Sequence, residues 1–122
     1  MKINNFFKVI RAGINTTYQD KGRFHMQHLG IAPAGCMDSQ SFFIANQLVG
    51  NNLSEGAIEF AYQGPLLELI KGQTKISITG NVIFKIIKNS REVINGVCNR
   101  SYNVEEGDQI DILATKDSAY GY

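Results

Sequence analysis

The side chains best suited to chemistry gather in the N-terminal third of the chain. Asp20 lies in a turn at Gln19–Gly22 and Arg23 directly follows it, so each carries its charge beside a tight loop. A guanidinium held there would stabilise negative charge that develops on a carboxyl or amide oxygen, and a carboxylate would position a polar ligand. The two side chains would alternatively pair with each other, an exposed contact that contributes only about 0 to 1 kcal/mol. Both interpretations stay open at this point.

Asp38 is a third candidate, because it directly precedes a helix-forming run that starts at Ser39. Its carboxylate would cap the first turn, where free N–H groups and the helix dipole favour negative charge. Capping explains Asp38 without chemistry, although a catalytic carboxylate also fits. The same helix end could activate the Cys36 thiol, but no histidine lies near it in sequence, and an inert loop thiol explains it as well. His25 and His28 leave opposite faces of an extended stretch, so we do not expect them to share a metal.

Composition excludes several classes of partner. The chain has 122 residues, 12 basic and 11 acidic side chains, a formal net charge of +1 and no run of Lys or Arg, so nothing predicts binding to nucleic acid or to an anionic membrane. No apolar run approaches the roughly 18 residues that span a bilayer, and the apolar stretch at the N-terminus is too short for a signal peptide. Cys36 and Cys98 form neither a metal-binding nor a redox spacing. We therefore expect a cytoplasmic protein without a metal site or a disulfide.

The sequence around these candidate residues predicts mostly β-strands. Short β-rich runs with turn residues between them predict a single domain over 1–122 that is mostly β, and we favour a β-barrel with one or two short helices. The stretch Pro33–Asn51 predicts the helix, with Phe42 and Ala45 on its broad apolar face and Phe43 pointing away. Gly50 is placed to close its last turn in the left-handed conformation.

Three strand regions carry more specific expectations. Val82–Ile87 is almost wholly apolar, which predicts a central strand buried on both faces. Asn95 and Gly96 together are a strong turn signal and predict a hairpin between the short strands on either side. In Ala57–Tyr62 the apolar residues alternate onto one face, which leaves Glu59 on the other face, either solvated or turned into a cleft.

Several motifs, in this order, resemble one family. They are Thr17–Arg23, Gly35–Asp38, Ala45–Asn51 and Ala57–Glu59 with Gly64-Pro65 after it, and the resemblance continues through Ile78–Gly80, Asn99–Ser101 and Glu106–Asp108 to Ala119-Tyr120. The sequence is similar to the biotin-dependent carboxyltransferase or allophanate hydrolase subunit 2 family. That family includes the C subunit of 5-oxoprolinase, the carboxyltransferase region of urea amidolyase and the antagonist of a sporulation kinase inhibitor. The resemblance implies a cyclophilin-like β-barrel.

The resemblance also implies a site and its partners. It suggests Arg23 as the catalytic cation, Asp20 and Asp38 as catalytic positioning groups, and a set of substrate-binding residues: Gln19, Gly35, Met37, Asn46 and Glu59. It implies substrates such as allophanate, carboxybiotin or 5-oxoproline, and a companion of the allophanate hydrolase subunit 1 type. No cofactor is expected to bind this chain directly; carboxybiotin or ATP would act through companion subunits.

The chain departs from the family pattern in composition and in length. Cys36 stands where relatives usually have Ala, His25 where they have Gly, and Asn81 where they have Ala. The chain corresponds to the N-terminal half of the family module, so we expect a hydrolase or carboxyltransferase fragment that is inactive alone. A non-catalytic regulatory or partner-binding protein, or the remnant of a split gene, are the alternatives. A terminal strand left unpaired would also favour a homodimer.

Overall fold

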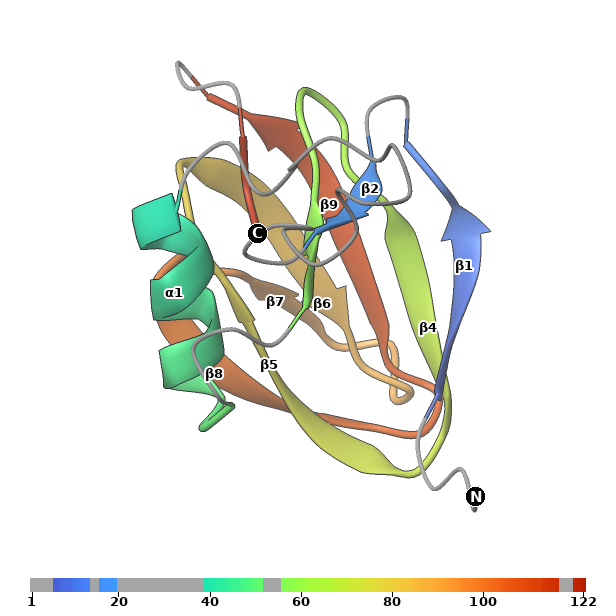
Figure 1. Ribbon diagram of the computed structural model, residues 1–122. Helices are drawn as coiled ribbons and strands as arrows, with labels where there is room; N and C mark the ends of the chain where they lie inside the picture. The colour runs from blue at the N-terminus through green and yellow to red at the C-terminus, as the bar shows by residue number, and fades with distance from the viewer. Residues whose placement is uncertain (1–5, 14–15, 20–38, 52–55, 117–119) are drawn as a thin grey trace, which may run out of the picture.

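The structure, a computed structural model, describes residues 6–13, 16–19, 39–51, 56–116 and 120–122 (Figure 1). These residues form nine strands and one helix, and the fold is therefore mostly β. In chain order the elements are β1 (Phe6–Arg11), β2 (Thr17–Gln19), α1 (Ser39–Leu48), β3 (Ala57–Glu59), β4 (Leu66–Lys71), β5 (Gln73–Ile78), β6 (Val82–Ile87), β7 (Val93–Asn95), β8 (Arg100–Glu105) and β9 (Gln109–Thr115). No helix among the described residues is long and apolar enough to cross a lipid bilayer.

The strands form three antiparallel sheets. Five strands make the largest sheet, in the order β1-β4-β9-β6-β7, while β2 pairs with β3 and β5 pairs with β8. Figure 1 shows β5 and β8 running together beside α1, and the larger sheet lying opposite them. The described strands do not close into one continuous sheet, so the expected barrel is not confirmed.

Two glycine turns carry the chain between the five-stranded sheet and the β5–β8 pair. Gly72 lies between β4 and β5, and Gly107 lies between β8 and β9, and each has a φ of +91°. A residue with a Cβ would be strained in this conformation. At Gly107 an added Cβ would also lie 2.8 Å from the side chain of Asn89. The two sheets therefore share continuous chain at one end and enclose the core between them.

The main core comes from the inward faces of both sheets. It consists of Phe60, Leu69, Ile78, Val82, Phe84, Ile86, Val104, Ile110 and Ile112. The prediction that Val82–Ile87 is buried on both faces is wrong, because Ile83 in β6 is 41% exposed. Strand β6 does lie inside the sheet, paired with β9 and β7, but burial covers only one of its faces. An apolar run alone does not distinguish these two situations.

The predicted hairpin at Asn95 and Gly96 is also wrong. Strand β7, which ends at Asn95, pairs with β6 through a turn at residues 88–92 rather than with the chain that follows it. The N–H of Gly96 donates to the carbonyl of Phe84, and a Cβ on Gly96 would lie 2.0 Å from the Phe84 ring. Gly96 therefore permits close packing against Phe84 and does not reverse the chain.

Helix α1 packs as its sequence predicts. Phe42 and Ala45 are buried and Phe43 is exposed. Gly50 has a φ of +77°, and its N–H donates to the carbonyl of Gln47, which closes the last turn as expected. The predicted positions of Phe42, Phe43, Ala45 and Gly50 are thus confirmed.

Two hydroxyl groups of the β5 segment anchor the helix by its backbone. Ser77 Oγ donates to the carbonyl of Ala45 at 2.6 Å, and Thr79 Oγ1 donates to the carbonyl of Ser41 at 2.7 Å. The two acceptors are four residues apart and so lie on one side of the helix. Because Ser77 and Thr79 alternate with the core residue Ile78, their side chains leave the strand towards α1.

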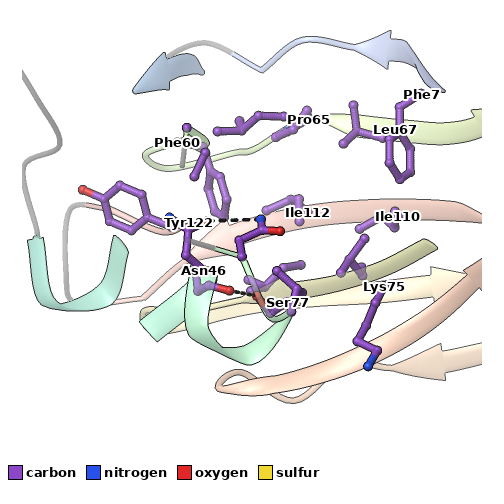
Figure 2. A pocket seen from close by; sticks show the side chains of 18 residues that line it. Phe7, Asn46, Phe60, Pro65, Leu67, Lys75, Ser77, Ile110, Ile112 and Tyr122 are labelled. Atoms are coloured by element: carbon purple, nitrogen blue, oxygen red, sulfur yellow. Dashed lines mark hydrogen bonds between the residues drawn. The ribbon is translucent and has the colours of Figure 1, made fainter. Parts of the chain in front are cut away.

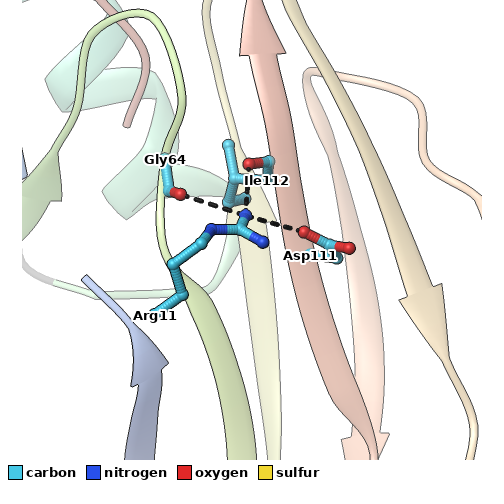
Figure 3. Close-up of polar contacts among 4 residues, drawn as sticks. All are labelled: Arg11, Gly64, Asp111 and Ile112. Atoms are coloured by element: carbon cyan, nitrogen blue, oxygen red, sulfur yellow. Dashed lines mark hydrogen bonds and ion pairs between the residues drawn. The ribbon is translucent and has the colours of Figure 1, made fainter. Parts of the chain in front are cut away.

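Arg11 links three strands at one edge of the large sheet (Figure 3). From the end of β1 its Nη2 donates to the carbonyls of Gly64 and Ile112, and it forms an ion pair with Asp111 at 2.8 Å. One guanidinium nitrogen therefore joins β1 to the start of β4 and to β9, which fixes the edge strand against its neighbours.

The last residues of the chain pair on two sides. Gly121 exchanges two backbone hydrogen bonds with Phe60, at 3.0 and 2.8 Å, and Tyr122 exchanges two with Thr79, at 2.7 and 3.1 Å. These residues join the β2–β3 pair to the β5–β8 pair. The reason given above for a homodimer, an unpaired terminal strand, does not apply to Gly121 and Tyr122; the homodimer itself stays a prediction.

Candidate functional site

The structure places two of the site residues predicted from the sequence, Asn46 and Glu59. Gln19 is the last residue of β2, where its backbone lies opposite Ala57. The remaining predicted residues lie outside the described residues: Asp20, Arg23, Gly35, Met37 and Asp38. Cys36, His25 and His28 lie outside them as well. The described part of the candidate site therefore consists of Asn46, Glu59 and the groups around them.

Glu59 is the buried acid of the site. It lies at the end of β3, opposite Thr17 of β2, and is only 5% exposed. The sequence left a choice between a solvated and an inward position, and the structure resolves it in favour of the inward one. The expected apolar face of this segment is not formed, because Tyr62 is 70% exposed and has a φ of +63°. Strand β3 has already ended before Tyr62, so alternation no longer applies there.

Tyr122 is a partner of Glu59 that the sequence did not predict. Its hydroxyl donates to Glu59 Oε2 at 2.5 Å, and both residues are buried. Its ring packs edge-on against Phe42 of α1, with the ring centroids 6.2 Å apart. A hydrogen bond of this kind offsets the cost of burying a carboxylate. Because the two residues are 63 positions apart, no local sequence signal indicates the pair.

Asn46 supplies a second polar group on the buried side of α1. It is 3% exposed, and its Oδ1 accepts from Nδ2 of Asn51 at 3.3 Å. Its carbonyl also accepts from the N–H of Asn51, at 2.9 Å, directly after the helix. The amide thus interrupts the apolar face that contains Phe42 and Ala45, and the role of Asn46 as a binding residue stays a prediction.

A cavity of about 220 Å³ opens between α1, β3, β5 and the large sheet. Its wall is mostly apolar and includes Phe7, Phe60, Leu67, Ile76, Ile110 and Ile112. Figure 2 shows the side chains of Leu67, Ile110 and Ile112 converging, while the ammonium group of Lys75 points away from them. Lys75 is the one charged residue among those that line the cavity. Asn46 and Tyr122 also line the cavity, so it adjoins the Glu59–Tyr122 pair, although most of its wall is apolar.

Asp108 is a second buried acid, at the turn between β8 and β9. It is 1% exposed, forms an ion pair with Lys88, and accepts from the N–H groups of Asn89 at 2.9 Å and Glu105 at 2.8 Å. Burial alone would raise the pKa of Asp108, but the hydrogen bond from Lys88 and the two N–H bonds together hold this pKa below its ordinary value. The described hydrogen bonds of Asp108 join its turn to the turn between β6 and β7 and to Leu69 of β4, so we assign it a structural role.

The described residues contain no group of three His, Cys, Asp or Glu side chains that could hold a metal ion.

The segment 20–38, which contains most of the predicted site, is attached at both ends to the elements described above. It follows Gln19 in β2, the partner strand of Glu59, and precedes Ser39 at the start of α1, which contains Asn46. The chain thus connects the predicted charged residues to the two elements that hold the described polar groups.

Comparison with known proteins supports one relationship. The family model described as carboxyltransferase domain, subdomain A and B, matches residues 29–122. The urea amidolyase of Lachancea kluyveri is 40% identical over 77 residues, which are 62% of this chain and 4% of that protein. The C subunit of the Escherichia coli 5-oxoprolinase is 46% identical over 52 residues, which are 43% of this chain and 17% of that protein.

A solved structure supports the same relationship. The urea amidolyase of K. lactis matches 100% of this chain with a TM-score of 0.82 and 31% identity, although the match covers only 7% of that protein. The chain therefore spans a small part of the relatives it matches.

Proposed function

The chain belongs to the family of the carboxyltransferase domain, subdomain A and B, and from this we propose that it acts as the N-terminal domain of a protein like allophanate hydrolase subunit 2 or the C subunit of 5-oxoprolinase. In this role it would act on amide or carboxyl-transfer substrates together with a companion of the allophanate hydrolase subunit 1 type. It would be inactive alone. The finer architecture that we propose is a cyclophilin-like barrel, completed by chain beyond the described strands.

The buried pair of Glu59 and Tyr122, with Asn46 nearby on α1, is the observation that supports a site here. Burial of a carboxylate is costly, and this one lies in a segment that resembles a family motif. Buried ionisable groups with specific partners are enriched at functional sites. The carboxylate and amide would orient a polar substrate from the side of α1 and β3.

The charge chemistry is assigned to residues of the segment 20–38. Arg23 would stabilise negative charge that develops on a carboxyl or amide oxygen, and Asp20 and Asp38 would position Arg23 and the substrate. Gln19, Gly35 and Met37 would contribute the remaining substrate contacts. Carboxybiotin or ATP would enter the reaction through companion subunits and not through a site on this chain.

The test is an assay of the chain with its companion subunits and the rest of the module, on allophanate and on 5-oxoproline with ATP. Arg23→Gln should lower kcat at least 100-fold, since loss of one charge-stabilising group costs about two to three orders of magnitude. Arg91→Gln is the matched control, because Arg91 is exposed in the turn before β7 and should leave the rate unchanged. No turnover of either substrate by the complete assembly would refute the enzymatic proposal.

A non-catalytic, partner-binding role is the second candidate, and exposed apolar side chains favour it. Tyr18 is 66% exposed and lies opposite Ile58, which is also exposed, on the β2–β3 pair, and Phe43 is exposed on α1. Aromatic side chains of this kind are enriched at interfaces. Titration with a protein of the allophanate hydrolase subunit 1 type should give binding that Tyr18→Ser weakens at least tenfold. Absence of binding at tens of micromolar would refute this second role.

A further inference from the structure

Thr79, directly after β5, is bonded to both sides of the candidate site. It belongs to the sequence motif Ile78–Gly80, and it is 0% exposed. Its side chain bonds to α1, the helix that carries Asn46, and its backbone bonds to Tyr122, the partner of Glu59. One fully buried residue therefore connects the amide of the site to its carboxylate.

The side chain of Thr79 holds α1 at a fixed depth. Its Oγ1 donates to the carbonyl of Ser41 at 2.7 Å, in the first turn of the helix. That carbonyl also accepts from the N–H four residues further on in an α-helix, so the hydroxyl bonds to the helix ladder itself. Asn46 lies further along the same helix, and a rigid element transmits a shift from one end to the other. The position of Asn46 therefore depends on this bond.

The backbone of Thr79 holds Tyr122. Its N–H donates to the carbonyl of Tyr122 at 2.7 Å, and its carbonyl accepts from the N–H of Tyr122 at 3.1 Å. The hydroxyl of Tyr122 then donates to Oε2 of Glu59 at 2.5 Å. The donor that reaches the buried carboxylate is thus placed by the main chain of Thr79.

Gly80 permits the close approach that this pairing needs. It has a φ of +101°, and a Cβ on it would lie 2.8 Å from the carbonyl oxygen of Tyr120. Gly121, which lies opposite Gly80, has no room for a Cβ either, because the ring of Phe60 would be 2.5 Å away. A side chain at Gly80 would therefore push residues 120–122 away from β5 and withdraw the Tyr122 hydroxyl from Glu59.

We propose that Thr79, with Gly80 beside it, is a positioning residue of the candidate site and fixes the separation between the Asn46 amide and the Glu59 carboxylate. Thr79 itself contacts no substrate and transfers no proton. Functional groups must stay within about 0.5 Å of their productive geometry, and a misplacement of about 1 Å can lower a rate about 100-fold. The reaction in which Asn46 and Glu59 would act rests on the function proposed above, whereas the separation rests on the bonds of Thr79.

NMR spectroscopy of the whole chain tests the separation without any assay of activity. Thr79→Val keeps the shape of the side chain and removes its bond to α1, so the side-chain amide signal of Asn46 should move by more than its linewidth. The carboxyl carbon signal of Glu59 should stay within its linewidth, because the backbone pairing of Thr79 remains. Thr79→Ser keeps the donor and should leave both signals in place.

Two further variants complete this comparison. Gly80→Ala should move the carboxyl carbon signal of Glu59, because the added methyl displaces Tyr122. Thr115→Val is the matched control: it also removes one hydroxyl hydrogen bond, to the N–H of Tyr62 at 2.9 Å, and should leave the signals of Asn46 and Glu59 in place. An Asn46 amide that Thr79→Val leaves unmoved, or that Thr115→Val moves equally, would overturn the proposal. This outcome does not depend on whether Gly80→Ala folds.

Kinetics of the complete assembly separate positioning from simple stabilisation. Thr79→Val should lower kcat at least about tenfold and change KM less than about threefold, because misplaced groups affect the transition state more than substrate binding. Thr79→Ser should restore kcat to within about threefold of the wild type. Asp108→Asn, a variant of the structural turn, should leave kcat unchanged at a temperature where circular dichroism shows all variants folded.

Equal effects of Thr79→Val and Asp108→Asn on kcat would show that Thr79 only stabilises the fold, and would overturn the positioning role. Failure of the proposed function looks different. The wild-type assembly itself would then turn over neither substrate, while the NMR comparison on the chain would still decide whether Thr79 sets the separation between Asn46 and Glu59.

Discussion

Replacing Asp108 with asparagine probes how the β8–β9 turn is held. Oδ1 of Asp108 accepts from the N–H of Asn89, while Oδ2 accepts from the N–H of Glu105 and from the ammonium group of Lys88. An asparagine keeps one oxygen, so its amide hydrogens must face at least one of these donors. The variant therefore loses at least one hydrogen bond to a buried charged group and its ion pair with Lys88.

The expected cost of Asp108→Asn follows from these losses. A hydrogen bond to a charged group contributes about 1.5 to 3 kcal/mol, and leaving a buried donor unpaired adds to this, so we expect a loss of about 2 to 4 kcal/mol. For a domain of this size that corresponds to a fall in Tm of roughly 10 °C. Urea unfolding followed by circular dichroism measures it. Glu106→Gln, an exposed neighbour in the same turn, is the control and should change stability by less than about 0.5 kcal/mol.

The pH dependence separates charge from shape. Because the pKa of Asp108 is lowered in the folded state, its contribution is complete above the unfolded pKa of about 3.9 and is lost as the pH falls through the lower folded pKa. The difference in stability between the wild type and Asp108→Asn should therefore shrink on acidification below about pH 4. A difference that stays constant with pH, or a cost below about 0.5 kcal/mol at neutral pH, would refute the reasoning.

Two further substitutions test other contacts. Tyr122→Phe removes the hydroxyl that donates to Glu59 and should lower the free energy of unfolding in urea by about 1 to 3 kcal/mol. The double variant Tyr122→Phe, Glu59→Gln should lose less stability than the two single variants added together, because both remove the same hydrogen bond. Strictly additive losses would contradict the pairing. Arg11→Gln removes the guanidinium nitrogen that bonds to Gly64, Asp111 and Ile112, and it should lower the free energy of unfolding by about 1 to 2 kcal/mol. This loss should depend little on salt, since two of the three acceptors are carbonyls. A loss that disappears in about 1 M salt would show that only the ion pair matters.

The helix was predictable because its signals are local. The apolar period, the outward position of Phe43 and the closing glycine at position 50 are all encoded within about four residues of the positions they affect. The structure confirms each of them, with Phe42 buried and Gly50 in the left-handed region. Its anchoring to Ser77 and Thr79 was not predictable, because those hydroxyls come from a strand more than thirty residues away in sequence.

Two of the errors in the strands share a cause. The burial of Ile83 and the function of Gly96 depend on which elements lie beside them. The sequence around each residue does not indicate these neighbours. Ile83 is exposed because the described elements cover only one face of β6. Gly96 looks like a turn residue but is needed because the ring of Phe84 occupies the space of a side chain. A glycine that admits a neighbour and a glycine that reverses the chain look the same in a sequence.

Glu59 shows which part of the candidate site could not be predicted from the sequence. Alternation left its direction undecided, and Tyr122, which donates a hydrogen bond to the buried carboxylate, comes from the C-terminal end of the described residues, 63 positions away. The backbone pairing of Gly121 with Phe60 and of Tyr122 with Thr79 brings this hydroxyl to Glu59. The sequence identified the residue but could not identify the contact.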